Sequence, residues 1–339
     1  MKRIKTEQAV GHVLCHDLTQ IIPGQYKGAR FRKGHIVTAE DIPVLLAMGK
    51  EHLYVWQMQE GIVHENDAAA RLCALCRGEH MRAGDVREGK IELFAEIDGL
   101  FQVDSARLRA VNAMEELMIA TRHGNVPVHA GDKLCGTRII PLVIEEEKLR
   151  AAEAAAGPAP LLRLLPYRLR TAAVITTGSE VLSGRIADKF TPVLKEKLAQ
   201  YGISVIFHAY SGDGKERIAE LIAAARDSGA ELILCTGGMS VDPDDNTPGA
   251  IRMSGAQIVT YGAPVLPGAM FLLGYFDDGT PVMGLPGCVM YAKTTVFDLA
   301  LPRVAAGVRM VREDFIAMGE GGLCLGCEDC RWPVCPFGK

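Results

Sequence analysis

The chain has 339 residues, of which 48% are hydrophobic and 23% charged, and its formal net charge is −4. This length is sufficient for two or three domains, and a near-neutral charge without a basic stripe argues against nucleic-acid binding. No apolar run approaches the roughly 18 residues of a membrane span, and the first residues lack the apolar core of a signal peptide. We therefore expect a cytoplasmic protein without membrane contact, in which the ten cysteines are mostly reduced.

Residues 1–60 predict a small β-rich unit. A short strand follows the turn at Lys33-Gly34, and a helix capped by Thr38 ends at Gly49. An apolar strand is then predicted over His52–Trp56.

Residues 61–150 predict an α+β region that is smaller than the domain after it. Helices are expected over 65–77 and 105–120, and a hairpin is expected around Asp98-Gly99. Residues 151–170 predict a linker, since an alanine-rich helix is broken there by the run Gly157-Pro158-Ala159-Pro160.

From residue 171 the pattern becomes a regular alternation of apolar strands and helices. We expect strands over 171–177, 203–208 and 231–236, and helices over 187–201, 215–228, a short stretch from Thr247, and 289–304. Such alternation predicts a parallel sheet covered on both faces, with right-handed crossovers. The predicted fold class is α/β, with a parallel-sheet, three-layer domain over 171–308 and a cysteine-rich tail over 309–339.

Three of the predicted strands end in glycine-rich loops, with the sequences TTGSE, YSGDG and CTGGMS. The carboxyl ends of parallel strands lie along one edge of a sheet, where ligands bind. Glycines allow close approach to the backbone, and bare N–H groups at helix N-termini suit phosphate. Asp213 and Asp245 fall at the same edge, and carboxylates beside a phosphate require a cation such as Mg²⁺.

A structural interpretation of each loop stands beside the functional one. Gly-Gly after a strand is often only a turn, and the run DPDDNTP is compatible with a helix cap. In that case Asn246 or Thr247 is the N-cap and Pro248 the first helical residue. Three such loops on one sheet edge favour a ligand site. Of the acids, we assign function to Asp245, and expect Asp242 and Asp244 to face solvent or shape the turn.

Residues 170–305 resemble the molybdopterin-binding domain of molybdopterin adenylyltransferase, molybdopterin molybdenumtransferase and the competence-damage-inducible proteins. The pattern GG-x-S/G-x-x-x-x-D-x-TP is matched by Gly237, Gly238, Ser240, Asp245, Thr247 and Pro248. The stretches TTGSE…GRIAD, GDGKERI, LPGA and GLPGC resemble the other loops of that domain. Residues 1–60 also resemble, with low specificity, the accessory regions of the molybdenumtransferases, although the order of domains differs.

The resemblance implies a pterin ligand, either molybdopterin, its adenylylated form or the molybdenum cofactor, and Mg²⁺-dependent chemistry at its phosphate. It implies catalytic roles for Asp245, also the Mg²⁺ ligand, and for Asp213. It further implies that the ligand is bound by Gly178, Ser179, Glu180, Asp188, Gly237, Gly238, Met239, Ser240, Thr247, Pro286 and Gly287. Implied partners are ATP or molybdate, a molybdoenzyme, and further copies of the chain in a homo-oligomer.

The resemblance leaves three functions open. The first is an enzyme of molybdenum cofactor biosynthesis that performs Mg²⁺-assisted adenylyl transfer or molybdate insertion. The second is a non-catalytic carrier or sensor of molybdopterin, favoured because acids usual in the family are missing where Ser179 and Gly214 stand. Lys189, Phe190 and Cys288 also replace residues usual in the family. The third is a nucleotide pyrophosphate hydrolase of the competence-damage type.

The last sixteen residues contain Cys324, Cys327, Cys330 and Cys335, spaced C-x2-C-x2-C-x4-C-P. Four thiolates within twelve residues suit Zn²⁺ or an iron–sulfur cluster, and the alternative is a flexible tail of free thiols. The pair Cys73-x2-Cys76 lies inside a predicted amphipathic helix without a partner pair, so we interpret these residues as core or surface cysteines.

Overall fold

The computed structural model describes all residues except 1, 23–24, 56–60, 241, 244 and 339. The chain forms two compact units, which are described separately below. Unit 1 comprises residues 1–96, 103–122 and 131–163, and unit 2 comprises residues 97–102, 123–130 and 164–339. Within the described residues no helix is both long and apolar enough to cross a membrane.

The N-terminal part of unit 1 consists of two strand pairs and a short helix. Its elements are β1 (Lys2–Lys5), η1 (Thr6–Gln8), β2 (Leu18–Ile22), β3 (Tyr26–Phe31), α1 (Asp41–Ala47) and β4 (His52–Val55). β1 pairs with β4 and β2 with β3, both antiparallel. Thr38 does not cap α1 through its side chain; instead its backbone N–H donates to the carboxylate of Asp41. Trp56, the expected end of the last strand, lies outside the described residues.

The rest of unit 1 is an α+β arrangement. Its elements are β5 (Ile62–His64), α2 (Glu65–Cys76), β6 (Met81–Ala83), β7 (Lys90–Ala95), α3 (Ser105–Asn112), β9 (Leu117–Thr121), β11 (Lys133–Ile139), β12 (Val143–Glu145) and α4 (Glu146–Ala156). An antiparallel sheet has the order β6-β7-β11-β9. Cys73 and Cys76 on α2 are buried, so they are core cysteines and not surface ones.

Two expectations for this region were wrong. The predicted helix over 105–120 ends at Asn112, because residues 117–121 alternate between buried and exposed positions as strand β9 and pair with β11. The predicted hairpin at Asp98-Gly99 does not form, since β7 belongs to the sheet above whereas β8 (Gly99–Val103) lies between β10 (Val126–Val128) and β13 (Leu162–Leu165). Helix α4 ends at Gly157, as its Gly-Pro run predicts. The segment expected to be a linker contains β13.

The large sheet of unit 2 has the order β15-β14-β16-β19-β18-β17. Its strands are β14 (Thr171–Thr177), β15 (Ser204–Ser211), β16 (Ile233–Thr236), β17 (Gln257–Tyr261), β18 (Leu272–Tyr275) and β19 (Pro281–Leu285). The four strands β15, β14, β16 and β19 are parallel. β18 is antiparallel to both of its neighbours, so the sheet is mostly parallel.

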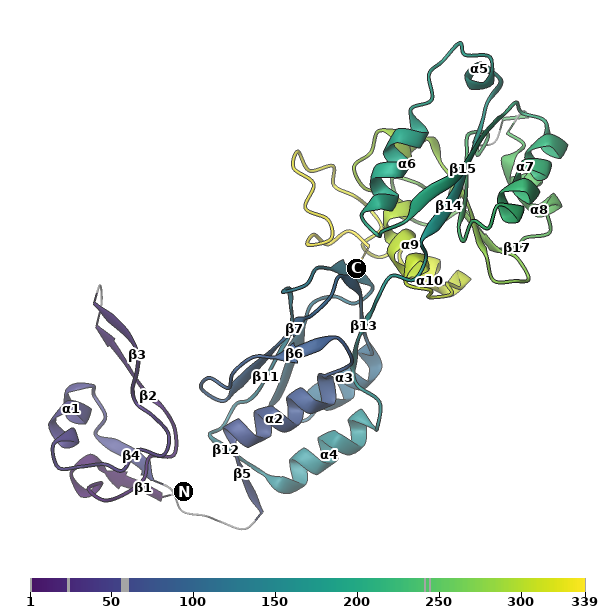
Figure 1. The fold of residues 1–339 in the computed structure, drawn as a ribbon. Helices are drawn as coiled ribbons and strands as arrows, with labels where there is room; N and C mark the ends of the chain where they lie inside the picture. Colours follow the sequence, from purple (N-terminus) through teal and green to yellow (C-terminus); the bar gives the residue numbers. More distant parts are fainter. Residues whose placement is uncertain (1, 23–24, 56–60, 241, 244, 339) are drawn as a thin grey trace. The chain divides into compact units, whose positions relative to one another are not determined.

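Helices cover both faces of this sheet, which makes the domain three-layered (Figure 1). They are α5 (Ser179–Leu182), α6 (Phe190–Ala199), α7 (Lys215–Asp227), α8 (Thr247–Met253), η2 (Gly287–Met290), α9 (Val296–Ala305) and α10 (Arg312–Ala317). Val174 packs with α6 and α9 on one face, whereas its neighbour Ile175 packs with α7 and α8 on the other. Such alternation is the reason that the consecutive residues 172–175 of β14 are all apolar. The helix expected over 289–304 begins later, at Val296, because Thr295 and Asp298 form a capping box there.

Candidate functional site

The first two loops at the carboxyl edge of the sheet are joined by Asp213. The N–H of Gly178 donates to the carbonyl of Ser211 at the end of β15, at 3.0 Å. Both the N–H and the hydroxyl of Ser179 donate to Oδ2 of Asp213. Ser179 therefore acts as a donor to the acid of the second loop. Glu180 follows it and is exposed.

The third loop folds tightly over the end of β14. Gly237 and Gly238 have φ of 84° and 55°, values that favour glycine. A Cβ on Gly237 would lie 2.3 Å from the carbonyl oxygen of Thr177, and one on Gly238 would lie 3.0 Å from Oγ1 of Thr247. The Thr247 hydroxyl also donates to the carbonyl of Gly237 at 2.8 Å. The sequence suggests glycines that admit a phosphate; the structure adds that the packing of the loop itself requires them.

The acids of the third loop have different environments. Asp242 is exposed, whereas Asp245 is half-buried; Asp244 lies outside the described residues. The N–H of Asp242 donates to Oδ2 of Asp245 at 3.0 Å, and the N–H of Asp245 donates to the carbonyl of Asp242 at 2.9 Å. These two bonds close a turn that holds the Asp245 carboxylate in place.

Asn246 joins the second and third loops, a role that the sequence reasoning missed. It is the N-cap residue of α8, with Pro248 in the first turn, but its side chain makes no capping bond. Instead its amide donates to the backbone carbonyl of Asp213 at 2.9 Å. The two proposed catalytic acids thus belong to one hydrogen-bonded set of loops. The only sequence signal for Asn246 is its place between Asp245 and Thr247.

The donor set of these loops suits a magnesium ion. Oδ2 of Asp213 and Oδ2 of Asp245 accept hydrogen bonds, whereas Oδ1 of each accepts none from the residues that the structure describes. Mg²⁺ binds one or two carboxylates together with phosphate oxygens. These two free oxygen atoms would be its ligands from the protein.

Lys215 adds a positive charge that the sequence reasoning also missed. It is the first residue of α7, directly after Gly214, and a Cβ on Gly249 of α8 would lie 3.0 Å from its Cε. Its ammonium group has no ion-pair partner among the described residues. An unpaired ammonium at this edge is suited to a phosphate.

Asp188, expected to contact the ligand, is occupied by its own helix. Oδ1 accepts the N–H groups of Phe190 and Thr191 at 2.8 and 3.0 Å, and Oδ2 accepts the Thr191 hydroxyl. Burial acts to raise the pKa of Asp188, but these hydrogen bonds and the nearby His208 outweigh it, so the pKa is lowered. His208, a further residue that the sequence did not indicate, contacts Thr191 and Thr176. Asp188 therefore caps the first turn of α6.

The remaining expected residues differ in accessibility. Met239 is buried in the core, where a Cβ on Gly284 would lie 2.6 Å from its side chain. Ser240 is exposed, and its carbonyl and that of Met239 accept the hydroxyl of Tyr261. Pro286 is buried and Gly287 exposed after β19.

The arrangement of the expected metal ligands does not match a site in which three or more protein side chains hold one metal ion. Among the described residues, no group of three or more His, Cys, Asp or Glu side chains is arranged to hold one metal ion. This applies to the four tail cysteines, of which Cys327 and Cys330 are exposed and Cys324 and Cys335 half-buried.

Two family models match the chain. Residues 173–306 match the model described as "Probable molybdopterin binding domain", which agrees with the resemblance drawn from the Gly-Gly loop. Residues 3–57 match a model described as a domain of unknown function.

Relatives with descriptions match only part of the chain. A candidate competence-damage inducible protein of Geobacillus sp. (strain WCH70) is 42% identical over 89 residues, 26% of this chain and 21% of that protein. A similar protein of Bacillus cereus (strain AH187) is 36% identical over 95 residues, 28% of this chain and 23% of that protein. The chain thus spans about a fifth of the length of these relatives.

Solved structures with a similar arrangement are also found. The molybdopterin biosynthesis enzyme MoaB of Thermus thermophilus is 20% identical with a TM-score of 0.34, covering 41% of this chain and 98% of that one. The protein CinA of Thermoplasma acidophilum is 19% identical with a TM-score of 0.30, covering 35% of this chain and 89% of that one.

Proposed function

We propose that this chain binds molybdopterin or the molybdenum cofactor and serves molybdenum cofactor biosynthesis, because residues 173–306 match the model described as "Probable molybdopterin binding domain". The ligand phosphate would lie at the carboxyl edge of the unit 2 sheet. The observation that carries this proposal is the bonded set of loops that joins Ser179, Asp213 and Asn246. A preformed set of loops at a sheet edge is the usual place for such a ligand.

The acidic residues at this edge would bind Mg²⁺, and the basic residue Lys215 would bind a phosphate of the ligand. Asp213 and Asp245 would hold Mg²⁺ through their free Oδ1 atoms, and the ion, when bound, neutralises charge on phosphate oxygens. Lys215 would neutralise a further phosphate charge from the first turn of α7, whose N–H groups favour anions. The side chain of Asp188 would not take part, since both of its oxygens are bonded to α6.

Binding is tested on full-length protein purified from a host that makes the cofactor, by oxidising the bound pterin and measuring its fluorescence. We expect Asp245→Asn to reduce pterin retention at least tenfold in the presence of Mg²⁺, equivalent to about 1.4 kcal/mol. Asparagine keeps an oxygen acceptor for the N–H of Asp242, so the turn is retained. Asp242→Asn is the matched control, because this exposed residue contributes only backbone atoms to that turn.

Turnover separates an enzyme from a carrier. A carrier retains pterin but, when supplied with ATP or molybdate and Mg²⁺, releases no product above the level of the Asp245→Asn variant. An enzyme shows turnover that depends on Asp245. Wild-type protein that retains no pterin from a cofactor-producing host would contradict both.

Nucleotide pyrophosphate hydrolysis is the second candidate function, favoured by the match to competence-damage inducible proteins. Its substrate would be a nucleoside diphosphate derivative, whose two phosphates suit the same carboxylates and Lys215. Incubation with ADP-ribose and a divalent ion is the test, and absence of released monophosphate removes this candidate.

A further inference from the structure

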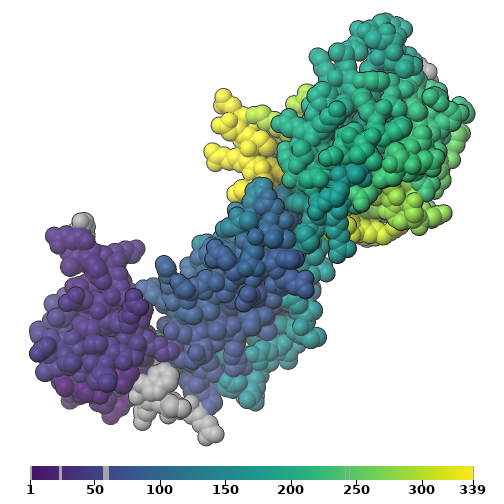
Figure 2. Space-filling view, in the orientation of Figure 1, coloured from purple at the N-terminus to yellow at the C-terminus, as the bar shows by residue number. Residues whose placement is uncertain are grey.

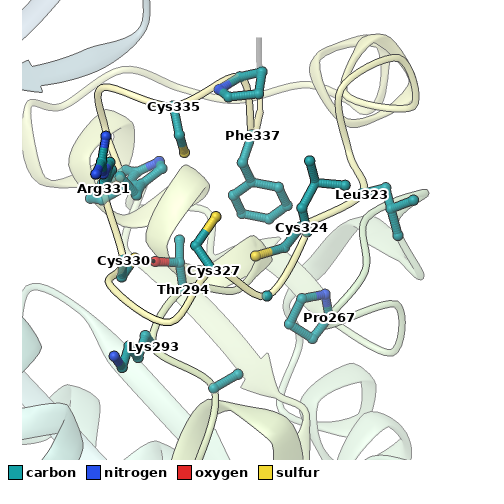
Figure 3. A pocket seen from close by; sticks show the side chains of 15 residues that line it. Pro267, Lys293, Thr294, Leu323, Cys324, Cys327, Cys330, Arg331, Cys335 and Phe337 are labelled. Atoms are coloured by element: carbon teal, nitrogen blue, oxygen red, sulfur yellow. Dashed lines mark hydrogen bonds between the residues drawn. The ribbon is translucent and has the colours of Figure 1, made fainter.

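The four cysteines of the C-terminal segment line one cavity in unit 2. This cavity has a volume of about 270 Å³. Besides the cysteines, Lys293, Thr294, Arg331, Trp332 and Phe337 contribute to its wall. Figure 3 shows the sulfur atoms of Cys324, Cys327 and Cys335 turned toward the same space. Thiols eleven residues apart in the chain are therefore gathered at a single site.

This segment is held against the domain, in contrast to the flexible tail that the sequence leaves open. The N–H of Cys324 donates to the carbonyl of Leu266 at 2.8 Å, and the N–H of Leu266 donates to the carbonyl of Gly322 at the same distance. At the other end, Phe337 is 4% exposed and packs in the core beside α9. The cysteines thus lie on a loop anchored at both ends, while Figure 2 shows the yellow C-terminal residues at the molecular surface.

Neighbouring groups present hydrogen-bond donors and positive charge to the cysteine loop. The Thr294 hydroxyl lies 3.1 Å from Sγ of Cys330, and the Lys293 ammonium donates to the carbonyl of Glu328 at 2.7 Å. The indole N–H of Trp332 is buried without a hydrogen-bond partner among the described residues. A buried unpaired N–H is unfavourable, and thiolate or sulfide sulfur in this cavity would be an acceptor for it.

The arrangement of the thiols around a cavity favours a cluster over a single ion. Tetrahedral zinc, with Zn–S bonds of about 2.3 Å, holds its four sulfur atoms about 3.8 Å apart. Over the part of the chain that the structure describes, no three side chains converge in this way. The cysteines instead surround a cavity with room for several atoms.

We propose that Cys324, Cys327, Cys330 and Cys335 ligate an iron–sulfur cluster of the [4Fe–4S] type. Three of them have the C-x2-C-x2-C spacing that wraps such clusters, and each thiol loses its proton when it binds iron. Lys293 and Arg331 offset the negative charge of the thiolates, and the Trp332 N–H donates to a sulfur. This site rests on residues other than those of the proposed pterin site, so either can fail without the other.

The test is anaerobic reconstitution of the full-length protein with ferrous iron and sulfide, with a parallel arm that supplies zinc alone. We expect about four irons and four sulfides per chain, together with the visible absorption of a cluster and an electron-paramagnetic signal after reduction. One zinc per chain that resists replacement by iron, an iron content of about two, or no bound metal would each overturn the proposal.

Cysteine substitutions test whether these thiols are the ligands of the cluster. Cys327→Ser combined with Cys330→Ser removes two exposed ligands, and we expect cluster content to fall at least fivefold with an unchanged circular dichroism spectrum. Cys288→Ala is the matched control, because this half-buried cysteine is not part of the cavity wall. Equal iron in the double variant and the wild-type protein, or equal loss in the control, would contradict the assignment.

Discussion

Replacing Gly237 by alanine tests whether the Gly-Gly loop is required by the fold. Alanine at position 237 is expected to reduce the free energy of unfolding in two ways. The first is the left-handed backbone, with φ of 84°, which costs an L-residue about 1–2 kcal/mol. The second is the new Cβ, which would lie 2.3 Å from the carbonyl oxygen and 2.7 Å from Oγ1 of Thr177. Since backbone of a central strand must shift to relieve this contact, overpacking adds about 1–3 kcal/mol. We expect Gly237→Ala to lower the free energy of unfolding of unit 2 by about 2–5 kcal/mol.

Gly279→Ala is a matched control for the backbone cost alone. Gly279 has φ of 88°, and a Cβ there would meet no atom within 4 Å. It should therefore lower the free energy of unfolding by only about 1–2 kcal/mol. The difference between the two variants measures the contact with Thr177.

Urea unfolding followed by the fluorescence of Trp332 measures both variants. The chain has two tryptophans, so a Trp56→Phe background leaves Trp332, which packs against the core of unit 2, as the only reporter. This background matters because a chain of two units need not unfold in one step. Equal losses for Gly237→Ala and Gly279→Ala would refute the packing argument and leave ligand approach as the reason for the glycine.

Three further outcomes are expected. Lys197→Met leaves the buried Asp298 without its ion-pair partner and should lower the free energy of unfolding by about 3–5 kcal/mol. The control Lys195→Met changes an exposed lysine on the same helix and should change the free energy of unfolding by less than about 0.5 kcal/mol. Equal effects of the two variants would show that the buried pair adds nothing to stability. Burial lowers the pKa of His208 below its usual 6.5, so the unfolded chain binds more protons between the folded-state pKa and pH 6.5. The contribution of His208 to stability is therefore present above pH 6.5 and lost as the pH falls through the folded-state pKa. Chemical denaturation at a series of pH values should show that the free energy of unfolding of His208→Gln falls less steeply toward acid pH than that of the wild-type protein. An equal pH dependence of the two proteins contradicts this assignment. Burial raises the pKa of the Cys235 thiol to about 12, so Cys235 should react slowly with alkylating reagents. After iodoacetamide treatment of native metal-free protein, mass spectrometry should find the exposed tail cysteines alkylated and Cys235 unmodified. Early labelling of Cys235 would contradict this expectation.

The layered domain and the edge where its glycine loops meet could be predicted because their signals are local. The strand Thr171–Thr177 is buried on both faces, and its apolar run over 172–175 can be seen in consecutive residues of the sequence. The glycine loops follow directly at the strand ends, so the parallel arrangement gathers them without any knowledge of side-chain contacts. From the sequence we also assigned function to Asp245 and expected Asp242 to face solvent or shape the turn, and Asp242 is exposed in the structure.

The roles of individual residues were decided by contacts between distant parts of the chain. Thr177 and Thr247 are 70 residues apart, yet their contact forms part of the packing that requires Gly237 to lack a side chain. Residues 117–121 became a strand because β11 was available to pair with them. Such pairings cannot be predicted from the local sequence, because their free energy depends on contacts with residues that are distant in the chain and adjacent only in the folded structure.

The composition and spacing of the sequence by themselves determined the three-layer domain, the edge where its loops meet, and the gathering of thiols at the C-terminus. Only the tertiary structure decided that Asp188 is used by its own helix, that Asn246 joins two loops, and that four cysteines surround a cavity. The physical reason is the range of the interactions. Burial patterns and turns act between near neighbours in sequence, whereas hydrogen bonds and cavities depend on which distant segments the folded chain brings together.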